Sequence, residues 1–179
     1  MSNIGEICDG KLENQAGIYY YLQNFGIVTK SKGGAHIVLS REEAEKLYAA
    51  NKYIPDDIYI EWIKTNPCNN SKNERYKLEV PVFTEDGIEL SLRGNYSKSR
   101  RGLNYSFCLL YKNTIKIRRW DTSPNEFKIK TSHKHRWDGI SDHETYLVND
   151  ICLNNVNEAF VDFLKECNID FNGHYQIVF

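Results

Sequence analysis

Two histidines separated by one residue, His133 and His135, are the side chains in this chain best suited to do chemistry. In an extended segment, alternate side chains lie on the same side, so both imidazoles would face one way with their Cβ atoms roughly 6–7 Å apart. Lys134 and Arg136 would face the other way. An imidazole titrates near neutral pH, and cationic neighbours lower its pKa toward the neutral, basic form. The pair is therefore suited to act as general acid and general base across a phosphodiester.

Arg119 and Asp121 form the second candidate group. In an extended segment they share one face with Ile115 and Ile117, and this face is expected to be largely buried. The opposite face is expected to carry Lys116, Arg118 and Trp120. Arg119 would stabilise phosphate charge, and Asp121 would orient one of the histidines. The alternative is a structural ion pair that orients the turn at Asp121-Thr122-Ser123-Pro124.

Two other interpretations of the histidine pair stay open. As metal ligands, His133 and His135 would need a third ligand, for which Asp121, Asp142 and His143 are candidates. None of these stands at a recognised spacing, so we expect no metal and no cofactor. Alternatively, the pair consists of half-exposed polar side chains on an edge strand and has no chemical role.

Charge is distributed unevenly along the chain. The total is −1, but residues 93–136 contain twelve Lys or Arg and two acids, a net charge of +10, while residues 138–172 sum to −7. A cationic stripe of this kind is typical of an anion-binding face, with Trp120 and Trp137 as stacking platforms for unpaired bases. The residues expected to contact nucleic acid are Lys98, Arg100, Arg101, Lys116, Arg118, Trp120, Lys134, Arg136 and Trp137. Alternatively, the basic and acidic segments face each other in the fold and neutralise one another.

The pattern of elements predicts an α+β fold. Ser40-Arg41-Glu42-Glu43 is a capping box that begins a helix ending before Pro55, and a second amphipathic helix follows Asn154 or Asn155. Strands are expected at 58–63, 75–83, 88–94, 104–111, 114–120 and 127–132, with a polar loop over 97–102 and a last short strand after Gly173. We therefore predict an antiparallel β-sheet meander with an N-terminal and a C-terminal helix packed on one face. Residues 1–39 are interpreted as a β-hairpin extension and residues 40–179 as a single domain.

Composition and the lack of recognisable targeting signals indicate in which cellular compartment the protein is expected. The 179 residues are 41% hydrophobic and 26% charged, as in one globular domain. Five cysteines without a Cys-x-x-Cys pair argue against a disulfide framework or a zinc knuckle. The sequence shows neither a signal peptide nor an apolar run of membrane-spanning length, so we expect a cytoplasmic protein without a membrane partner.

One set of motifs is similar to a known family. The motifs lie between about Asn104 and Ile169 and comprise Tyr105, Arg119-x-Asp121-x-x-Pro124, His133-x-His135 and the closing amphipathic helix. This arrangement resembles small bacterial domains of the TumE-like toxin–antitoxin kind and related uncharacterised families. The resemblance implies a compact α+β domain encoded in bacterial genetic-conflict loci, and it assigns Arg119, Asp121, His133 and His135 to the shared motif.

Together these observations lead to one leading hypothesis and one rival. The leading hypothesis is a component of a bacterial or phage conflict system that engages RNA or a nucleoprotein complex through its basic face. If it is catalytic, it would be a metal-independent endoribonuclease with His133 and His135 as acid and base. The rival is a non-enzymatic inhibitor, such as an antitoxin or counter-defence protein, that docks onto a cognate protein or a nucleoprotein.

Overall fold

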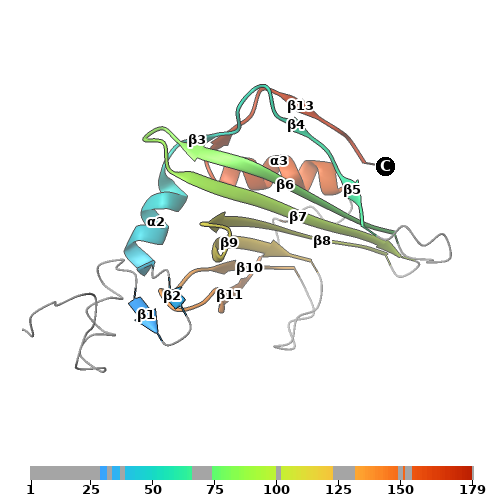
Figure 1. Cartoon of the computed structure of the whole chain (residues 1–179). Helices are drawn as coiled ribbons and strands as arrows, with labels where there is room; N and C mark the ends of the chain where they lie inside the picture. Colours follow the sequence, from blue (N-terminus) through green and yellow to red (C-terminus); the bar gives the residue numbers. More distant parts are fainter. Residues whose placement is uncertain are drawn as a thin grey trace, which may run out of the picture.

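The structure is a computed structural model that describes residues 29–31, 34–36, 39–65, 74–99, 102–122, 132–148, 151 and 155–178. These residues form one nine-stranded sheet, with strand order β11-β10-β9-β8-β7-β6-β3-β12 and β5 also paired to β6, together with helices and shorter strand pairs (Figure 1). Its strands are β3 (Lys52–Tyr53), β5 (Ile63–Lys64), β6 (Glu74–Thr84), β7 (Glu89–Ser99), β8 (Gly102–Tyr111), β9 (Ile115–Asp121), β10 (His133–Arg136), β11 (Glu144–Leu147) and β12 (Ile169–Asp170). Neighbours are antiparallel except for the parallel pair of β12 and β3, so the sheet is mixed and mostly antiparallel.

The central meander follows the sequence pattern. Strands β6 and β7 form one hairpin and β8 and β9 form another, as the turn residues predict. Gly87 adopts a φ of 83° in the first turn, and Lys112 and Asn113 adopt φ of 48° and 60° in the second. The predicted polar loop over 97–102 is wrong in extent, since Ser97 pairs with Asn104 and the ladder continues to Ser99.

Several short strands lie outside the central meander. The strand predicted over 58–63 is divided into β4 (Tyr59–Ile60) and β5, and β4 pairs in parallel with β13 (His174–Tyr175). A small hairpin of β1 (Thr29–Ser31) and β2 (Gly34–His36) lies within the predicted N-terminal extension. The predicted strand at 127–132 lies outside the described residues apart from Ser132. Strands β3, β11 and β12 had no counterpart in the sequence-based prediction.

A β-bulge at Ile117 decides which side chains of β9 share a face. Leu110 pairs with Lys116, but Leu109 pairs with Arg118, so Ile117 is an extra residue in β9. An extra residue shifts the alternation by one position. The predicted common face of Ile117 and Arg119 is therefore wrong. Beyond the bulge Arg118 shares a face with Trp120, and Arg119 shares the opposite face with Lys116.

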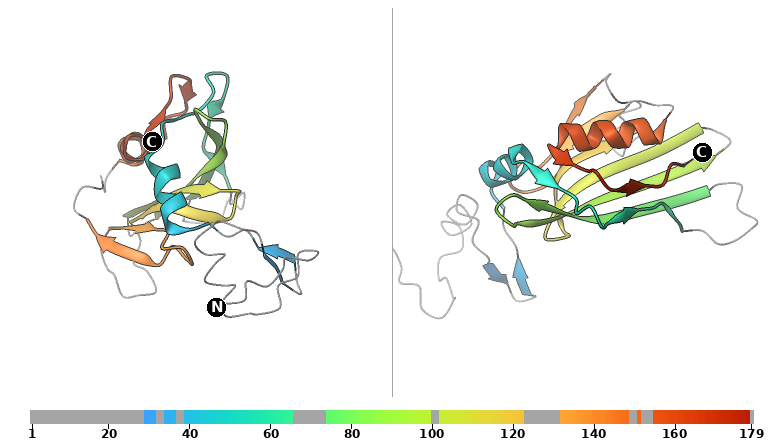
Figure 2. Two further views of the ribbon diagram at one scale, coloured as in Figure 1. Left: turned by 90° about the vertical axis from the view of Figure 1, so that its left-hand side faces the viewer. Right: turned by 90° about the horizontal axis from the view of Figure 1, so that it is seen from above.

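The described residues contain two helices, α2 (Arg41–Ala49) and α3 (Val156–Glu166). The capping box of α2 is present, with Ser40 and Glu43 as its partners, and Asn155 caps α3 through the backbone N–H groups of Asn157 and Glu158. Figure 2 shows α3 lying along the sheet. Its aromatic side chains pack there, since the rings of Phe160 and Phe163 each lie 5.6 Å from that of Phe107 in β8. Among the described residues, no helix is long and apolar enough to cross a membrane.

The buried Lys52 joins α2 to the sheet. Its ammonium group donates hydrogen bonds to the carbonyl oxygens of Leu47, Tyr48 and Ala50 at the carboxyl end of the helix. These carbonyls have no partner within the helix, so the lysine acts as its cap. Burial lowers the pKa of Lys52 to about 8.

Candidate active site

The pairing of β9 with β10 brings the four predicted catalytic side chains together. His133 stands opposite Asp121 and His135 stands opposite Arg119. Directly opposed residues of an antiparallel pair project to the same face, so all four lie on one side of the sheet. One ligand-capable atom from each of Asp121, His133 and His135 lies within 4.8 Å of the others.

The two histidines are buried in the sheet. Their ring centroids are 4.8 Å apart, and the residues are 0% and 1% exposed. Strand β10 lies between β9 and β11, so it is not an edge strand. The alternative of half-exposed histidines on an edge strand is therefore wrong.

His135 is held by hydrogen bonds that define its protonation state. Its Nδ1 lies 2.9 Å from the carbonyl oxygen of Asp142 and 3.0 Å from Oγ1 of Thr145, which itself donates to the carbonyl of His143. Nη2 of Arg119 lies 3.0 Å from Nε2 of His135 and 3.2 Å from Nδ1. Because the guanidinium only donates, we assign the proton of the neutral ring to Nδ1, with Nε2 accepting from Arg119.

The same surroundings make His135 a weak base. Burial first, and then the charge of Arg119, lower the pKa of His135 to about 4. The ring is thus neutral at physiological pH, and its single proton on Nδ1 is held by the carbonyl oxygen of Asp142, so it lacks the second proton that an imidazolium would give to a leaving group. His135 is better suited to position Arg119 than to act as the predicted general acid.

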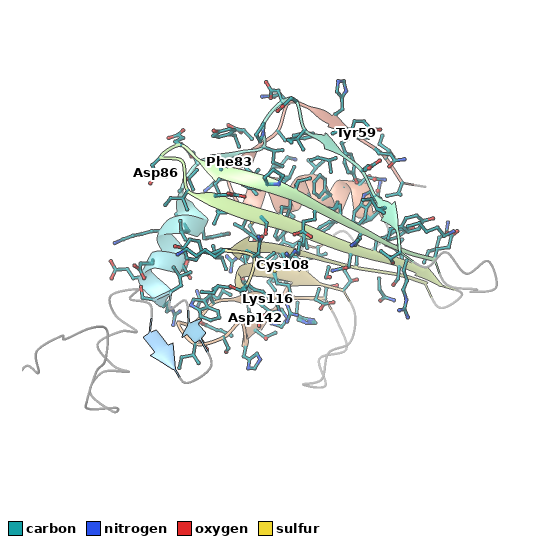
Figure 3. All side chains as sticks on the ribbon, viewed as in Figure 1. Tyr59, Phe83, Asp86, Cys108, Lys116 and Asp142 are labelled. Carbon is teal, nitrogen blue, oxygen red and sulfur yellow. The ribbon has the colours of Figure 1, made fainter. Side chains whose placement is uncertain are left out.

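Asp142 reaches this site from the loop between β10 and β11. Its Oδ2 lies 3.2 Å from Nε of Arg119 and 3.4 Å from Nζ of Lys116. Figure 3 labels Lys116 and Asp142, together with Cys108, which stands opposite Arg119 in β8. Sequence reasoning considered Asp142 only as a metal ligand, because nothing in the local pattern shows that the loop folds back on β9.

Asp121 also borders an open hollow of 460 Å³. Polar side chains of β7 and β8 line the hollow, among them Asn95, Asn104 and Ser106. Ser106 stands between Asn95 and Asp121 in the sheet register, so these hydrogen-bonding groups form a row that leads to His133. The row offers amide and hydroxyl groups beside the cluster.

A metal ion would have to share this cluster with a guanidinium. Two imidazoles and one carboxylate are a common ligand set for divalent transition metals. However, both ring nitrogens of His135 lie within hydrogen-bond distance of Arg119 Nη2. That fixed positive charge opposes a second cation at His135.

The comparisons with known proteins now identify the family. A family model described as Toxin TumE matches residues 57–170, which is more than half of the chain. This chain belongs to the TumE toxin family. The predicted resemblance is confirmed, and the match extends beyond the residues from about 104 to 169 that carried it. The comparisons with curated proteins and with solved structures found no match.

The TumE match covers the whole candidate site. It runs from the start of β4 to the end of β12 and includes Arg119, Asp121, His133, His135 and Asp142. Helix α2 and strand β13 lie outside it. The cluster on β9 and β10 is thus part of the TumE domain.

Several residues predicted to contact nucleic acid lie inside the TumE domain's core. Trp120 is 2% exposed and Lys134 is 5% exposed. Both donate to the carboxylate of Glu166 in α3. Lys134 also lies over the Trp120 ring, 4.4 Å from its centroid. Both side chains are buried, so the prediction that they lie on a nucleic-acid-binding surface is wrong.

Arg118 is held between aromatic rings next to this pair. Its guanidinium lies 4.1 Å from the ring centroid of Tyr48 in α2 and 5.6 Å from that of Tyr146 in β11. Its Nε also lies 3.2 Å from Glu166. Arg118 therefore belongs to the packing between the helices and the sheet, not to an open basic face.

The other predicted contacts are spread over the molecule. Arg136 pairs with Glu144, and Nε1 of Trp137 donates to the carbonyl oxygen of Leu39. Lys98 is exposed near the end of β7. Arg100 and Arg101 lie outside the described residues. Of the predicted contacts that the structure describes, Lys116 is the one that lies beside the cluster.

The basic and acidic segments meet in the fold. Asp142 pairs with Lys116 and Arg119, and Glu166 pairs with Arg118 and Lys134. Glu144 pairs with Arg136 and with Arg41 of α2. Five bases of the 93–136 segment thus pair with three acids of the 138–172 segment, so the two segments face each other and offset part of each other's charge. This agrees in part with the second of the two interpretations of the charge pattern.

Proposed function

We propose that this TumE-family chain is the toxin of a bacterial toxin–antitoxin system and that it cleaves RNA without a metal ion. The observation that supports this most directly is the register of β9 and β10, which sets Asp121 opposite His133 and Arg119 opposite His135. A carboxylate opposite one imidazole and a guanidinium beside the other are groups that suit phosphodiester cleavage.

The proposed reaction begins with the ribose 2′-hydroxyl. His133, oriented by Asp121, accepts the hydroxyl proton as the oxygen attacks the adjacent phosphorus. Arg119 offsets the negative charge that develops on the phosphoryl oxygens. The bond between phosphorus and the 5′-oxygen then breaks, which leaves a 2′,3′-cyclic phosphate, and the 5′-oxygen takes a proton from water. The hydroxide formed takes back the proton that His133 holds. His135 stays neutral and positions Arg119.

The hollow beside Asp121 supports a single-stranded substrate. Its amide and hydroxyl groups suit the edges of unpaired bases and the ribose hydroxyls. Asn95, Asn104 and Ser106 are uncharged, so they would recognise nucleosides and leave the phosphate to Arg119. The proposal includes a cognate antitoxin as protein partner and the cytoplasm as compartment.

The burial of His133 favours a second candidate function. A group that is 0% exposed must be uncovered before it can meet a substrate. In the second proposal the chain is not an enzyme and acts by binding a protein or nucleoprotein complex. The histidines would then serve only to hold β9, β10 and β11 together.

A cleavage assay with matched variants separates the two proposals. The wild type, His133→Asn and Asp121→Asn are incubated with single-stranded RNA and run on a denaturing gel, with and without a chelator. We expect cleavage by the wild type in both conditions and a loss of 10²-fold or more, on the order of a missing general base, in both variants. His174→Asn, which alters an exposed histidine of β13, serves as the control and should cleave normally.

The folded state is checked by circular dichroism in every variant. Cleavage that disappears with the chelator contradicts the metal-free reaction. No cleavage by the wild type, or equal cleavage by wild type and the double variant His133→Ala, His135→Ala, contradicts the enzyme proposal and leaves the binding proposal.

A further inference from the structure

We propose that Lys116 and Arg119 form a binding site for a phosphate group of the RNA backbone, which the carboxylate of Asp142 occupies until the RNA displaces it. This inference rests on the proposed function for the identity of the anion. It adds Lys116 as a second cation to the site, and it makes Asp142 a competitor for the phosphate that the site would bind.

The geometry is that of an occupied anion site. Two cations from β9 converge on a single oxygen, since Asp142 Oδ2 lies 3.2 Å from Arg119 Nε and 3.4 Å from Lys116 Nζ. The bulge at Ile117 makes this possible, because it sets Lys116 and Arg119 on one face although they are three residues apart. In an unbroken strand, residues three apart face opposite ways.

The carboxylate fits this site imperfectly. Among the described residues, neither Asp142 Oδ2 nor Arg119 Nε has a hydrogen-bond partner, although both atoms are buried. The two atoms attract each other by charge without the alignment that a hydrogen bond needs. A backbone phosphate carries two charged oxygens, as a carboxylate does, and can likewise meet a guanidinium with two parallel hydrogen bonds. Unlike the carboxylate of Asp142, it is not tied to the β10–β11 loop, so it can align with Arg119 and make the hydrogen bond that Asp142 Oδ2 does not make.

The backbone of Asp142 is anchored independently of its side chain. Its carbonyl oxygen accepts the hydrogen bond from Nδ1 of His135 at 2.9 Å. Asp138 holds the start of the same loop, where its Oδ1 accepts from the N–H groups of Ile140 and Ser141. Rotation of the Asp142 side chain can thus free both cations without unfolding the loop. Only the side chain of Asp142 has to move for a phosphate to take its place.

A second carboxylate provides a matched comparison. Glu144 also pairs with two cations, Arg136 and Arg41. In the strand register, however, Glu144 is one residue away from Thr145, which shares the face of His135, so Glu144 lies on the opposite face. Neutralising Glu144 changes the total charge by the same amount as neutralising Asp142, but at a distance from the cluster.

The test measures binding rather than cleavage. A single-stranded oligonucleotide that lacks the 2′-hydroxyl groups cannot undergo the proposed reaction, so its affinity is measured by fluorescence anisotropy over a salt series. We expect Asp142→Asn to bind about 10-fold more tightly than the wild type, with a salt dependence steeper by one to two phosphate contacts. Glu144→Gln should change affinity by less than about 2-fold. Equal gains in the two variants would overturn the proposal.

A second pair of variants tests the cations without disturbing the loop. Lys116 is 41% exposed, so Lys116→Gln should fold normally, and we expect it to bind the oligonucleotide more weakly than Lys112→Gln, which removes an exposed charge in the β8–β9 turn. Equal affinities of these two variants overturn the proposal even if Asp142→Asn does not fold. Because the probe cannot be cleaved, these outcomes are independent of whether the wild type cuts RNA.

Discussion

The guanidinium of Arg119 and the imidazole of His135 face each other across β9 and β10, with 3.0 Å between Nη2 and Nε2. An arginine does not lose its proton in a protein, so the histidine must be the acceptor. The pair thus fixes two properties of the site together, the orientation of the cation and the neutral state of the ring. A pH titration of His135 can therefore test this arrangement.

His135 is predicted to stay neutral down to a pH of about 4, where its pKa lies because of burial and the charge of Arg119. In the unfolded chain the ring titrates near 6.5. The folded state therefore binds fewer protons between these values, and the contribution to stability is complete above 6.5 and lost as pH falls through 4. The full difference is on the order of 3 kcal/mol. Histidine ring resonances in an NMR titration give the pKa directly.

Removing the cation provides the control for this titration. In Arg119→Gln the positive neighbour is gone, so the pKa of His135 is expected to rise while burial still holds it below its ordinary value. An unchanged pKa in this variant would show that Arg119 does not act on the ring as described.

Glu166→Ala is expected to lower the free energy of unfolding by about 3–5 kcal/mol. The reason is that Glu166 compensates two largely buried cations, Arg118 and Lys134, and removing it leaves their charges without a partner. Chemical denaturation measures the loss. The double variant Glu166→Gln, Lys134→Met should recover part of it, and a double variant no more stable than Glu166→Ala would contradict this account.

Deletion of Ile117 is expected to cost more than about 3 kcal/mol of stability, well above the usual effect of a single change. Without the extra residue, either Lys116 or the Arg118–Asp121 segment must turn to the other face. Ile117→Val keeps the bulge and should cost only about 0.5–1.5 kcal/mol. Thermal unfolding of the two variants distinguishes the loss of the bulge from the loss of a methylene group.

In the alkaline pH range, Lys52 is expected to make the free energy of unfolding increase with pH. Burial lowers its pKa to about 8 in the folded chain, whereas a lysine in an unfolded chain titrates near 10.4. The folded state thus binds fewer protons between those values, so the contribution of Lys52 is complete above about 10.4 and lost as pH falls through 8. The difference in unfolding free energy between wild type and Lys52→Met, measured from pH 7 to 11, should follow this course. A flat difference would contradict it.

Local signals in the sequence were sufficient for the local elements. The helix caps at Ser40 and Asn155 and the turns at Gly87 and Asn113 depend on a few neighbouring residues, and the structure has them as predicted. The convergence of Arg119 and Asp121 with the two histidines was also part of the hypothesis. The pairing of β9 with β10 that brings these side chains together was not predicted from the sequence.

The remaining features depend on contacts between distant segments. A bulge leaves no mark in a run such as Ile115 to Asp121, since the extra residue is an ordinary isoleucine, and the predicted faces were wrong beyond it. The burial of Trp120 and Lys134 requires Glu166, which lies more than thirty residues further along the chain. The contact of Asp142 with β9 could not be predicted either, because it depends on how β11 pairs with β10.

The parallel pairs β3 with β12 and β4 with β13 carry a consequence for synthesis. Lys52 is translated 117 residues before its partner Ile169, a delay of roughly 6–23 s at ordinary translation rates. The meander and all four residues of the cluster therefore leave the ribosome while one edge of β3 still lacks its neighbour. An unpaired edge is a template for strands of other chains. In a nascent chain, the cluster on β9 and β10 can thus assemble before the opposite side of the sheet is protected.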